Sequence, residues 1–467
     1  MPDAPELIVS GTGSVSVSTD ALLSDSERLR ALSLALPVVS LSLCGVAGIA
    51  GPTEARALGS WRARQADVAI AMARTRLDAA IQECERIADA LDAAALAYGE
   101  TERAAAARFI SVAEDLASRG GTVVGDIVDR NRGLAALLAL LATSAARNRL
   151  WQAIGPNDVA LPDDLNILLS DPGVVRMLGS LLMAGDDFVD GVVDVPRSES
   201  TSEVGAAALV LLSLGAMGGL FSPAPVTTSA VGASRSVPPA TTVAERARRI
   251  PNAVAGDVPQ VRIERYSEPG LPDRFEVYIG GTVDFSPVAK GEPFDLTSNL
   301  ELEAGLPAGA YVGVQQAMEQ AGVTSDTPVV LTGHSQGGLV ASRLAASGEY
   351  AVDALVTFGA PAGQVAIPPS VPALIVENTD DVVPALGGVQ ANGDALVVRA
   401  RAFPPGQPLP SGLALPAHRI EAYRETAKAI DERAQSGELV AFRERLAALT
   451  AGYTQGAAQH YLVTREG

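Results

Sequence analysis

The sequence predicts an α/β fold, with a mostly parallel sheet flanked by helices, over residues 259–467, and an all-α helical region before it. Two observations support this division. Short apolar strands alternate with helical segments after residue 259, which is typical of a parallel sheet. In the N-terminal part, apolar residues instead recur on alternating three- and four-residue steps, which is typical of packed helices.

Length and composition limit the number of domains and the kinds of partner. A chain of 467 residues is too long for one ordinary domain, so we expect about two to four. A formal net charge of -19 would repel phosphate backbones, so we expect no nucleic-acid partner. The two cysteines, Cys44 and Cys84, provide neither a disulfide framework nor a cysteine-based zinc site, and we expect both to be buried apolar side chains.

Residues 1–120 are predicted to form a helical hairpin that turns near Gly51 and Pro52. Each helix would place one apolar seam against the other and turn its charged side chains outward. The seam comprises Leu22, Leu29, Leu32, Leu36, Val39, Leu43 and Val46 on the first helix, and Leu77, Ile81, Cys84, Ala88, Leu91, Ala95 and Tyr98 on the second.

Residues 121–222 are predicted to form a helical connector domain, because short apolar helical segments alternate there with Gly, Pro and Asp. Residues 223–258, which are rich in Ser, Pro, Thr and Ala, are expected to be a linker. Two uncharged stretches, residues 31–51 and 204–234, require a membrane check. Pro37 in the first and the short apolar run in the second argue against a membrane span, and contact with a membrane stays open.

The most specific motif is Gly333-His-Ser-Gln-Gly337. A short apolar strand runs directly into it and a helix-forming sequence follows, so the serine lies at a strand-turn-helix junction. Small residues two positions before and after Ser335 avoid collision with the neighbouring strand and helix. The turn would also direct the backbone N–H of Gln336 toward a developing oxyanion. The pattern predicts that Ser335 is a nucleophile.

A serine hydroxyl needs a base, and the chain contains three histidines, His334, His418 and His460. His334 would project away from Ser335 and pack at the turn. His418 follows a loop and opens a helix, which gives the chain order nucleophile, acid, histidine. We expect His418 to be the base, with His460 as the alternative.

The acid should end a strand between the serine and the histidine. Residues 372–378 are predicted to form such a strand, and Asp380 and Asp381 follow it as two adjacent candidates. The chosen carboxylate would accept a hydrogen bond from His418 and stabilise the imidazolium that forms as Ser335 attacks.

The C-terminal part resembles the α/β-hydrolase superfamily of serine esterases and lipases, through the motif at residues 333–337 in its strand-turn-helix setting. Three further sequences look like motifs of the class 3 lipase group within that superfamily. They are Ile279-Gly-Gly-Thr282, Phe294-Asp-Leu-Thr-Ser-Asn299 and Phe358-Gly-Ala-Pro361. In the first sequence, Gly280 stands where the group has an arginine. In the second, the aromatic residue Phe294 precedes the aspartate, whereas in the group a tryptophan follows it.

This resemblance implies roles for three residues. The group has an acid immediately before an x-Val-Pro sequence, which Asp381 matches, so the neighbouring Asp380 would be a solvated loop charge. Thr282 would supply a second oxyanion donor through its backbone N–H, beside that of Gln336.

These features together predict a serine esterase or lipase that hydrolyses carboxylic esters through an acyl-enzyme on Ser335. The resemblance implies that these esters are lipids. The reaction needs neither a metal nor an organic cofactor. Thioesters and amides remain alternative substrates, because such a site treats all acyl groups alike.

The N-terminal hairpin resembles the WxG-type substrates of type VII secretion. Gly59-Ser-Trp61 lies near the turn, where that family has Trp-x-Gly, and Tyr98-Gly-Glu-Thr-Glu102 matches its YxxxD/E export signal. The resemblance implies a secreted effector, toxin or interaction protein whose hairpin binds the secretion machinery. We expect a secreted or cell-envelope protein without a conventional signal peptide, with a cytoplasmic location as the alternative. A tyrosine packed in the seam, with a glutamate one turn later, would explain the same residues structurally.

Overall fold

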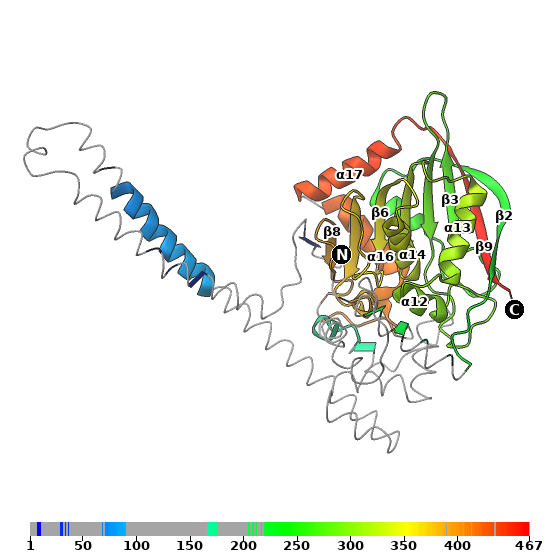
Figure 1. Ribbon diagram of the computed structural model, residues 1–467, viewed down its shortest axis with the longest axis horizontal. Coiled ribbons are helices and arrows are strands. Elements are labelled where there is room, and N and C mark those ends of the chain that lie inside the picture. The colour runs from blue at the N-terminus through cyan, green and yellow to red at the C-terminus, as the bar shows by residue number, and fades with distance from the viewer. Residues whose placement is uncertain are drawn as a thin grey trace, which may run out of the picture. The chain divides into compact units, whose positions relative to one another are not determined.

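The computed structural model describes most of the C-terminal half and shorter pieces of the N-terminal half (Figure 1). The described residues are 7–10, 29, 30, 33, 36, 68, 71–89, 166, 167, 169–175, 204, 205, 208, 209, 212, 216, 219–388, 390–404, 406–411, 413–433 and 436–466. The chain divides into two compact units, of which the smaller comprises Ser16–Ala104 and the larger comprises Met1–Val15 with Ala105–Gly467.

In the smaller unit, residues 71–89 form a helix whose burial follows the predicted seam. Ala88 is buried, and Leu77, Ile81 and Cys84 are half-buried, while every other position of this helix is exposed. The guanidinium of Arg30, itself a helical residue, donates to Asp89 over 2.9 Å. The remaining seam positions of the second helix, Cys44, the turn near Gly51, Trp61 and Tyr98 lie outside the described residues.

A nine-stranded sheet forms the centre of the larger unit, in the order β1-β8-β7-β6-β5-β4-β3-β9-β2. The strands are β1 (Leu7–Ser10), β2 (Val226–Val237), β3 (Val261–Tyr266), β4 (Arg274–Ile279), β5 (Val329–His334), β6 (Val352–Phe358), β7 (Ala373–Asn378), β8 (Leu396–Ala400) and β9 (Gly456–Arg465). Strands β4 to β8 are parallel, whereas β1, β3, β9 and β2 join their neighbours antiparallel. The sheet is therefore mixed, and the prediction of a mostly parallel sheet is correct for its central strands alone.

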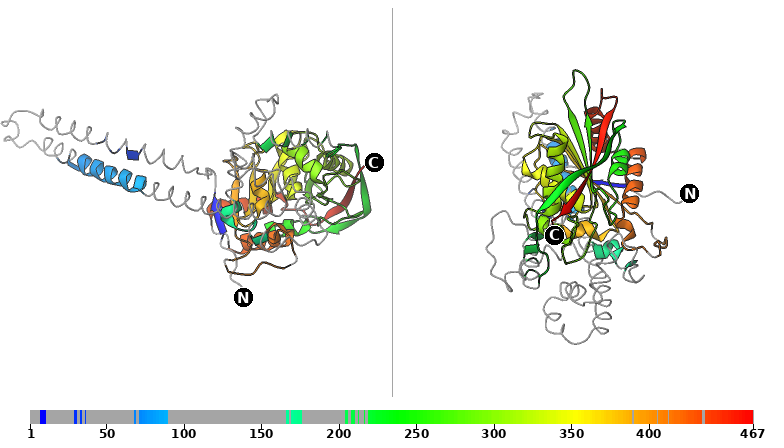
Figure 2. Two further views of the ribbon diagram at one scale, coloured as in Figure 1. Left: turned by 90° about the horizontal axis from the view of Figure 1, so that it is seen from below. Right: turned by 90° about the vertical axis from the view of Figure 1, so that its right-hand side faces the viewer.

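Helices cover both faces of this sheet, as Figure 2 shows with the yellow-green helices on one side and the orange ones on the other. The helices are α11 (Val243–Arg249), α12 (Leu296–Glu303), α13 (Gly309–Ala321), α14 (Gln336–Ser347), α15 (Val382–Leu386), α16 (Ile420–Arg433) and α17 (Gly437–Leu449), with a 3-10 turn η1 (Pro416–His418). Helices α12, α13 and α14 share one apolar core with Leu331 of β5, while α11, α16 and α17 share the other with Val330. Neighbouring residues of β5 thus face opposite cores, as the strand geometry requires.

Two boundaries drawn from the sequence are wrong. The expected linker, residues 223–258, contains β2, which pairs with β9, and α11, which packs on α16. Leu7–Ser10 was assigned to the hairpin region but pairs with β8 as the other edge strand. Both strands lie at sheet edges, and most of β2 is exposed, so its composition resembles that of a linker.

The membrane check has a clear result for the described residues. None of their helices combines the length and the apolar character that a membrane span needs.

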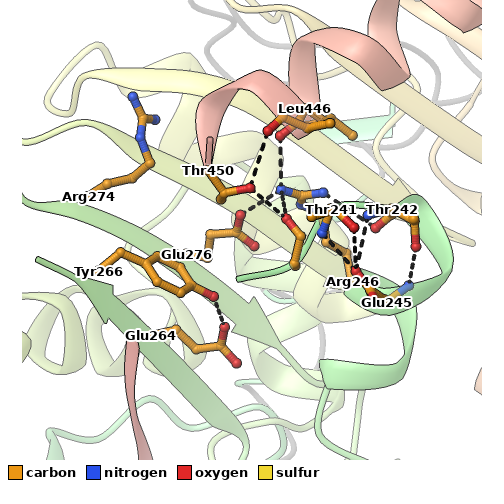
Figure 3. Close-up of polar contacts among 12 residues, drawn as sticks. Thr241, Thr242, Glu245, Arg246, Glu264, Tyr266, Arg274, Glu276, Leu446 and Thr450 are labelled. Atoms are coloured by element: carbon orange, nitrogen blue, oxygen red, sulfur yellow. Dashed lines mark hydrogen bonds and ion pairs between the residues drawn. The ribbon is translucent and has the colours of Figure 1, made fainter. Parts of the chain in front are cut away.

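A buried ion pair holds α11 against the sheet (Figure 3). The guanidinium of Arg246 donates to Glu276 of β4 over 2.6 Å, and both side chains are fully buried. The same guanidinium donates to the carbonyl of Ala240 at 3.0 Å, and the other carboxylate oxygen of Glu276 accepts from the Tyr278 hydroxyl. Because both side chains are fully buried, removal of one partner would leave the other charge buried and uncompensated.

Replacement of Arg246 is therefore expected to be strongly destabilising. Arg246→Ala should lower the free energy of unfolding by about 3–5 kcal/mol, since Glu276 would lose its cation inside the protein. Arg265→Ala is the matched control, because the ion pair of Arg265 with Asp273 lies at the surface, with side chains 52% and 36% exposed, and its loss should cost less than about 1 kcal/mol. Urea-induced unfolding followed by near-ultraviolet circular dichroism measures both losses. Equal losses would contradict the buried role of Arg246.

Candidate active site

Ser335 lies on a tight turn between β5 and α14, with an unusual backbone conformation. Its φ of 53° and ψ of -125° are rarely adopted by a residue with a side chain, and such a conformation costs about 1–3 kcal/mol. A Cβ atom added at Gly333 would lie 2.2 Å from the carbonyl oxygen of Gly337, and one added at Gly337 would lie 2.3 Å from the carbonyl oxygens of Ile279 and Gly280. Only glycine fits at either position, as the spacing of the motif predicts.

The structure brings the predicted serine, histidine and aspartate together. The Nε2 atom of His418, on η1, lies 2.9 Å from Oγ of Ser335. The Nδ1 atom of His418 lies 2.8 Å from Oδ2 of Asp381, which precedes α15. All three residues are buried, with exposed fractions from 2% to 9%. These distances form a continuous hydrogen-bonded chain from a carboxylate to a serine hydroxyl.

Further donors fix the carboxylate of Asp381. Its Oδ1 atom accepts from the backbone N–H of Val383 at 2.9 Å, and its Oδ2 atom also accepts from the hydroxyl of Tyr423 at 2.6 Å. Burial raises the pKa of Tyr423 well above its usual value, and the nearby Asp381 raises it further, so the phenol keeps its proton and remains a donor. Sequence reasoning missed Tyr423, because a tyrosine inside a helix carries no motif.

The neighbouring Asp380 points elsewhere. Its carboxylate accepts from the backbone N–H groups of Ala402 and Phe403, each at 2.9 Å. Asp380 is 2% exposed, so the expectation that it is a solvated loop charge is wrong. The two backbone donors supply the hydrogen bonds that water would otherwise provide. The geometry thus distinguishes the two adjacent carboxylates, and only Asp381 contacts His418.

His334 packs at the turn, as expected, but it lines the same hollow as Ser335 instead of projecting away from it, and it also contacts the loop of His418. Its Nε2–H donates to the backbone carbonyl of His418 at 2.8 Å. Burial lowers the pKa of His334 to about 3, with a further contribution from the neighbouring His418, so the imidazole is neutral near pH 7. His460 instead lies on β9, opposite Arg262 of β3, and is not brought to Ser335.

Two backbone N–H groups are available beside Ser335. Those of Thr282 and Gln336 donate to no acceptor within the described chain. The side chain of Asn299 donates to the hydroxyl of Thr282 at 2.9 Å, and the side chain of Gln336 donates to the carbonyl of Asp295 at 2.8 Å. Both predicted oxyanion donors are therefore anchored by residues of the segment 294–299, although sequence reasoning assigned no role to Asp295 or Asn299.

A hollow of about 240 Å³ opens at Ser335 and His418. Its other lining residues are Pro251, Asn252, Ala253, Val254, Gly281, Thr282, Phe285, His334, Ala414, Leu415, Arg419, Ile420 and Glu421. The guanidinium of Arg424 anchors one wall by donating to the carbonyl of Ile250 at 3.2 Å and to Asn252 at 2.9 Å. Gly281 keeps the floor open, since a Cβ atom there would lie 3.1 Å from that of Ser335.

The arrangement contains the parts that an acyl transfer requires. A serine hydroxyl faces an imidazole nitrogen, a carboxylate holds the other nitrogen, and two free N–H groups lie next to the serine. Among the described residues, no three His, Cys, Asp or Glu side chains gather so that they could hold a metal ion. The chain matches no known protein-family model, no curated protein and no solved structure.

The low pKa of His334 predicts a loss of stability in acid. The group titrates near 6.5 in the unfolded chain and near 3 in the folded one, so the unfolded chain binds more protons between these values. The contribution of His334 to the free energy of unfolding should therefore fall as the pH drops from about 6.5 toward about 3. His334→Gln removes the titrating ring but keeps an amide that can donate to the carbonyl of His418, so the variant should lose less stability over this range.

Urea-induced unfolding of both proteins at about pH 7 and about pH 4.5 measures this difference. Burial raises the pKa of Glu292 and of Glu301 to about 7, which favours the folded state in acid, but both groups are present in the two proteins and cancel in the comparison. A variant that loses as much stability as the wild type would show that His334 does not contribute to the acid sensitivity.

Proposed function

We propose that this chain is a serine hydrolase of the α/β-hydrolase type, which cleaves carboxylic esters through an acyl-enzyme on Ser335. The observation that carries the proposal is the hydrogen-bonded chain from Asp381 through His418 to Ser335, with distances of 2.8 Å and 2.9 Å. A central parallel sheet with helices on both faces, and a serine on a strained turn at the end of one strand, support the same fold type.

The geometry supports a definite sequence of proton transfers. His418 donates its Nδ1–H to Asp381 and accepts the hydroxyl proton of Ser335 at Nε2, so the resting imidazole is neutral. As Oγ attacks the ester carbonyl, the proton passes to Nε2, and Asp381 stabilises the imidazolium. His418 then gives this proton to the leaving alcohol. Water, activated by the same nitrogen, hydrolyses the acyl-enzyme in the second half of the cycle.

The oxyanion of the tetrahedral intermediate would be bound by the backbone N–H groups of Thr282 and Gln336. Fixed donors of this kind are worth about 3–4 kcal/mol each in the transition state, because they need no reorganisation during the reaction. Their anchoring by Asn299 and Asp295 gives a physical role to two residues of a segment that resembles the class 3 lipases. A lipid ester as substrate rests on that resemblance alone.

The secretion hypothesis for the N-terminal hairpin stays a prediction. The half-buried seam of residues 71–89 is compatible with it, but Trp61 and the export motif at Tyr98 lie outside the described residues.

Thioesters and amides are the alternative substrates, and they differ from esters in the leaving group that His418 must protonate.

Replacement of Ser335 tests the proposed function directly. Ser335→Ala should abolish labelling by a fluorophosphonate and lower kcat for ester hydrolysis by about 10⁶-fold, because the covalent step is lost. A graded series of p-nitrophenyl esters, together with matched thioesters and anilides, would measure activity and rank the substrates. Ser342→Ala is the matched control, since Ser342 lies buried on α14, the helix that follows Ser335, and its hydroxyl donates to the carbonyl of Gly338 at 2.9 Å. Full ester hydrolysis by Ser335→Ala would refute the proposal.

A further inference from the structure

The loop that carries His418 has a backbone conformation that needs external support. Leu415, three residues before the histidine, has a φ of 44° and a ψ of 59°, in the left-handed region that favours glycine. Leu415 is 5% exposed and lines the hollow at Ser335. Because the conformation is unfavourable for a leucine, the loop keeps it only where its surroundings hold it.

Side chains from three separate parts of the chain hold the backbone of this loop. His334, the last residue of β5, donates to the carbonyl of His418 at 2.8 Å. Asn378, at the end of β7, donates to the carbonyl of Ala417 at 2.8 Å. Both of these residues belong to the sheet, next to Ser335 and Asp381. The third support comes from a distant part of the sequence.

Asn166 makes two hydrogen bonds to the loop. Its amide Nδ2 donates to the carbonyl of Leu413 at 2.8 Å, and its Oδ1 accepts from the backbone N–H of Leu415 at 3.0 Å. The amide thereby hydrogen-bonds to backbone groups of Leu413 and Leu415, two residues apart, as an adjacent β-strand would. Leu415 is the residue with the left-handed backbone. Asn166 is 4% exposed, so water does not compete effectively for these bonds.

The helical residues around Asn166 are themselves anchored. The backbone N–H of Ser170 donates to the carbonyl of Asn166 at 3.1 Å, and the carboxylate of Asp171 accepts from the backbone N–H of Gly173 at 2.8 Å. Leu169 and Val174 are buried. The amide of Asn166 thus projects toward the loop from a helical segment whose own apolar side chains are buried.

We propose that Asn166 is a positioning residue, which holds the His418 loop so that Nε2 reaches Ser335. The helical residues around Asn166 then contribute to the active site, although they supply no reacting group. This inference rests on the proposed hydrolase function. Asparagine suits the role because its amide offers one donor and one acceptor side by side, whereas aspartate offers two acceptors and leucine offers neither.

The chain contains a close match to this contact away from the site. Asn392 donates to the carbonyl of Val365 at 2.8 Å and accepts from the backbone N–H of Ile367 at 2.8 Å, so it bridges two backbone groups with the same spacing. None of these three residues lines the hollow at Ser335. Asn392→Ala therefore removes the same two kinds of hydrogen bond, together with one to the side chain of Gln390 at 2.7 Å, without touching the loop of His418, and is the matched control.

The test compares Asn166→Ala, Asn166→Asp and Asn392→Ala with the wild type, all as the full chain. We expect both Asn166 variants to lower kcat for p-nitrophenyl esters, and the rate of fluorophosphonate labelling, by about 10- to 100-fold with little change in KM, because the nucleophile loses its aligned base. Asn392→Ala should change both rates by less than about twofold. The thermal unfolding midpoint should fall in both Asn166→Ala and Asn392→Ala, since each loses its two hydrogen bonds to the backbone.

Wild-type rates in Asn166→Ala, or an equal loss of rate in Asn392→Ala, would overturn the inference while the proposed function stood. If the wild type reacts with neither probe, the proposed function fails. The position of His418 is then measured by proton NMR, which needs no substrate. The low-field proton resonance of its Nδ1–H, bonded to Asp381, should be present in the wild type and in Asn392→Ala, and shifted or lost in Asn166→Ala. An unchanged resonance in Asn166→Ala would overturn the positioning role as well.

Discussion

The positive-φ turn at Ser335 determines how closely β4, β5 and α14 approach one another. Gly337 leaves no room for a side chain against the carbonyl oxygens of Ile279 and Gly280, so the end of β4 passes directly beside the first turn of α14. That contact is what brings Thr282, three residues after β4, next to Ser335. The close approach of β4, β5 and α14 therefore accounts for three features. They are the strained backbone of Ser335, the close packing of Gly333 and Gly337, and the free N–H group of Thr282.

Around this turn, side-chain amides and an imidazole hydrogen-bond to backbone carbonyls or, in the case of Asn299, to a hydroxyl. Asn378, His334, Asn299 and Gln336 each link a loop to an element of the sheet or to a neighbouring segment. Loops alone would be too flexible to hold a base within 3 Å of a nucleophile, because few of their own backbone groups pair internally. The neutral state of His334 suits this role, since a buried cation beside His418 would oppose the formation of a second positive charge there.

The sequence predicted β5 and β7 because each is a short apolar run that begins directly after a proline, whereas β6 and β8 were not predicted. It predicted Ser335 because the glycine spacing has a steric cause, and His418 because few histidines compete for the role. It failed at β2 and at Leu7–Ser10, since edge strands bury one side at most and keep a polar composition. Asn166 and Tyr423 could not be found, because an amide or hydroxyl that bonds to a group hundreds or tens of residues away has no local pattern.

The position of β9 has a consequence for the order in which the protein can form. This strand is the last of the nine in the chain, yet it lies between β3 and β2 inside the sheet. Its residue Arg465 binds the carboxylate of Asp295, whose carbonyl in turn holds Gln336 beside the nucleophile. During synthesis the ribosome delivers the strands one after another, and the gap between β3 and β2 stays open until β9 has emerged. A nascent chain would therefore carry all three members of the serine, histidine and aspartate set before it could hold them in working order. The proposed activity would then appear only once the sheet is closed.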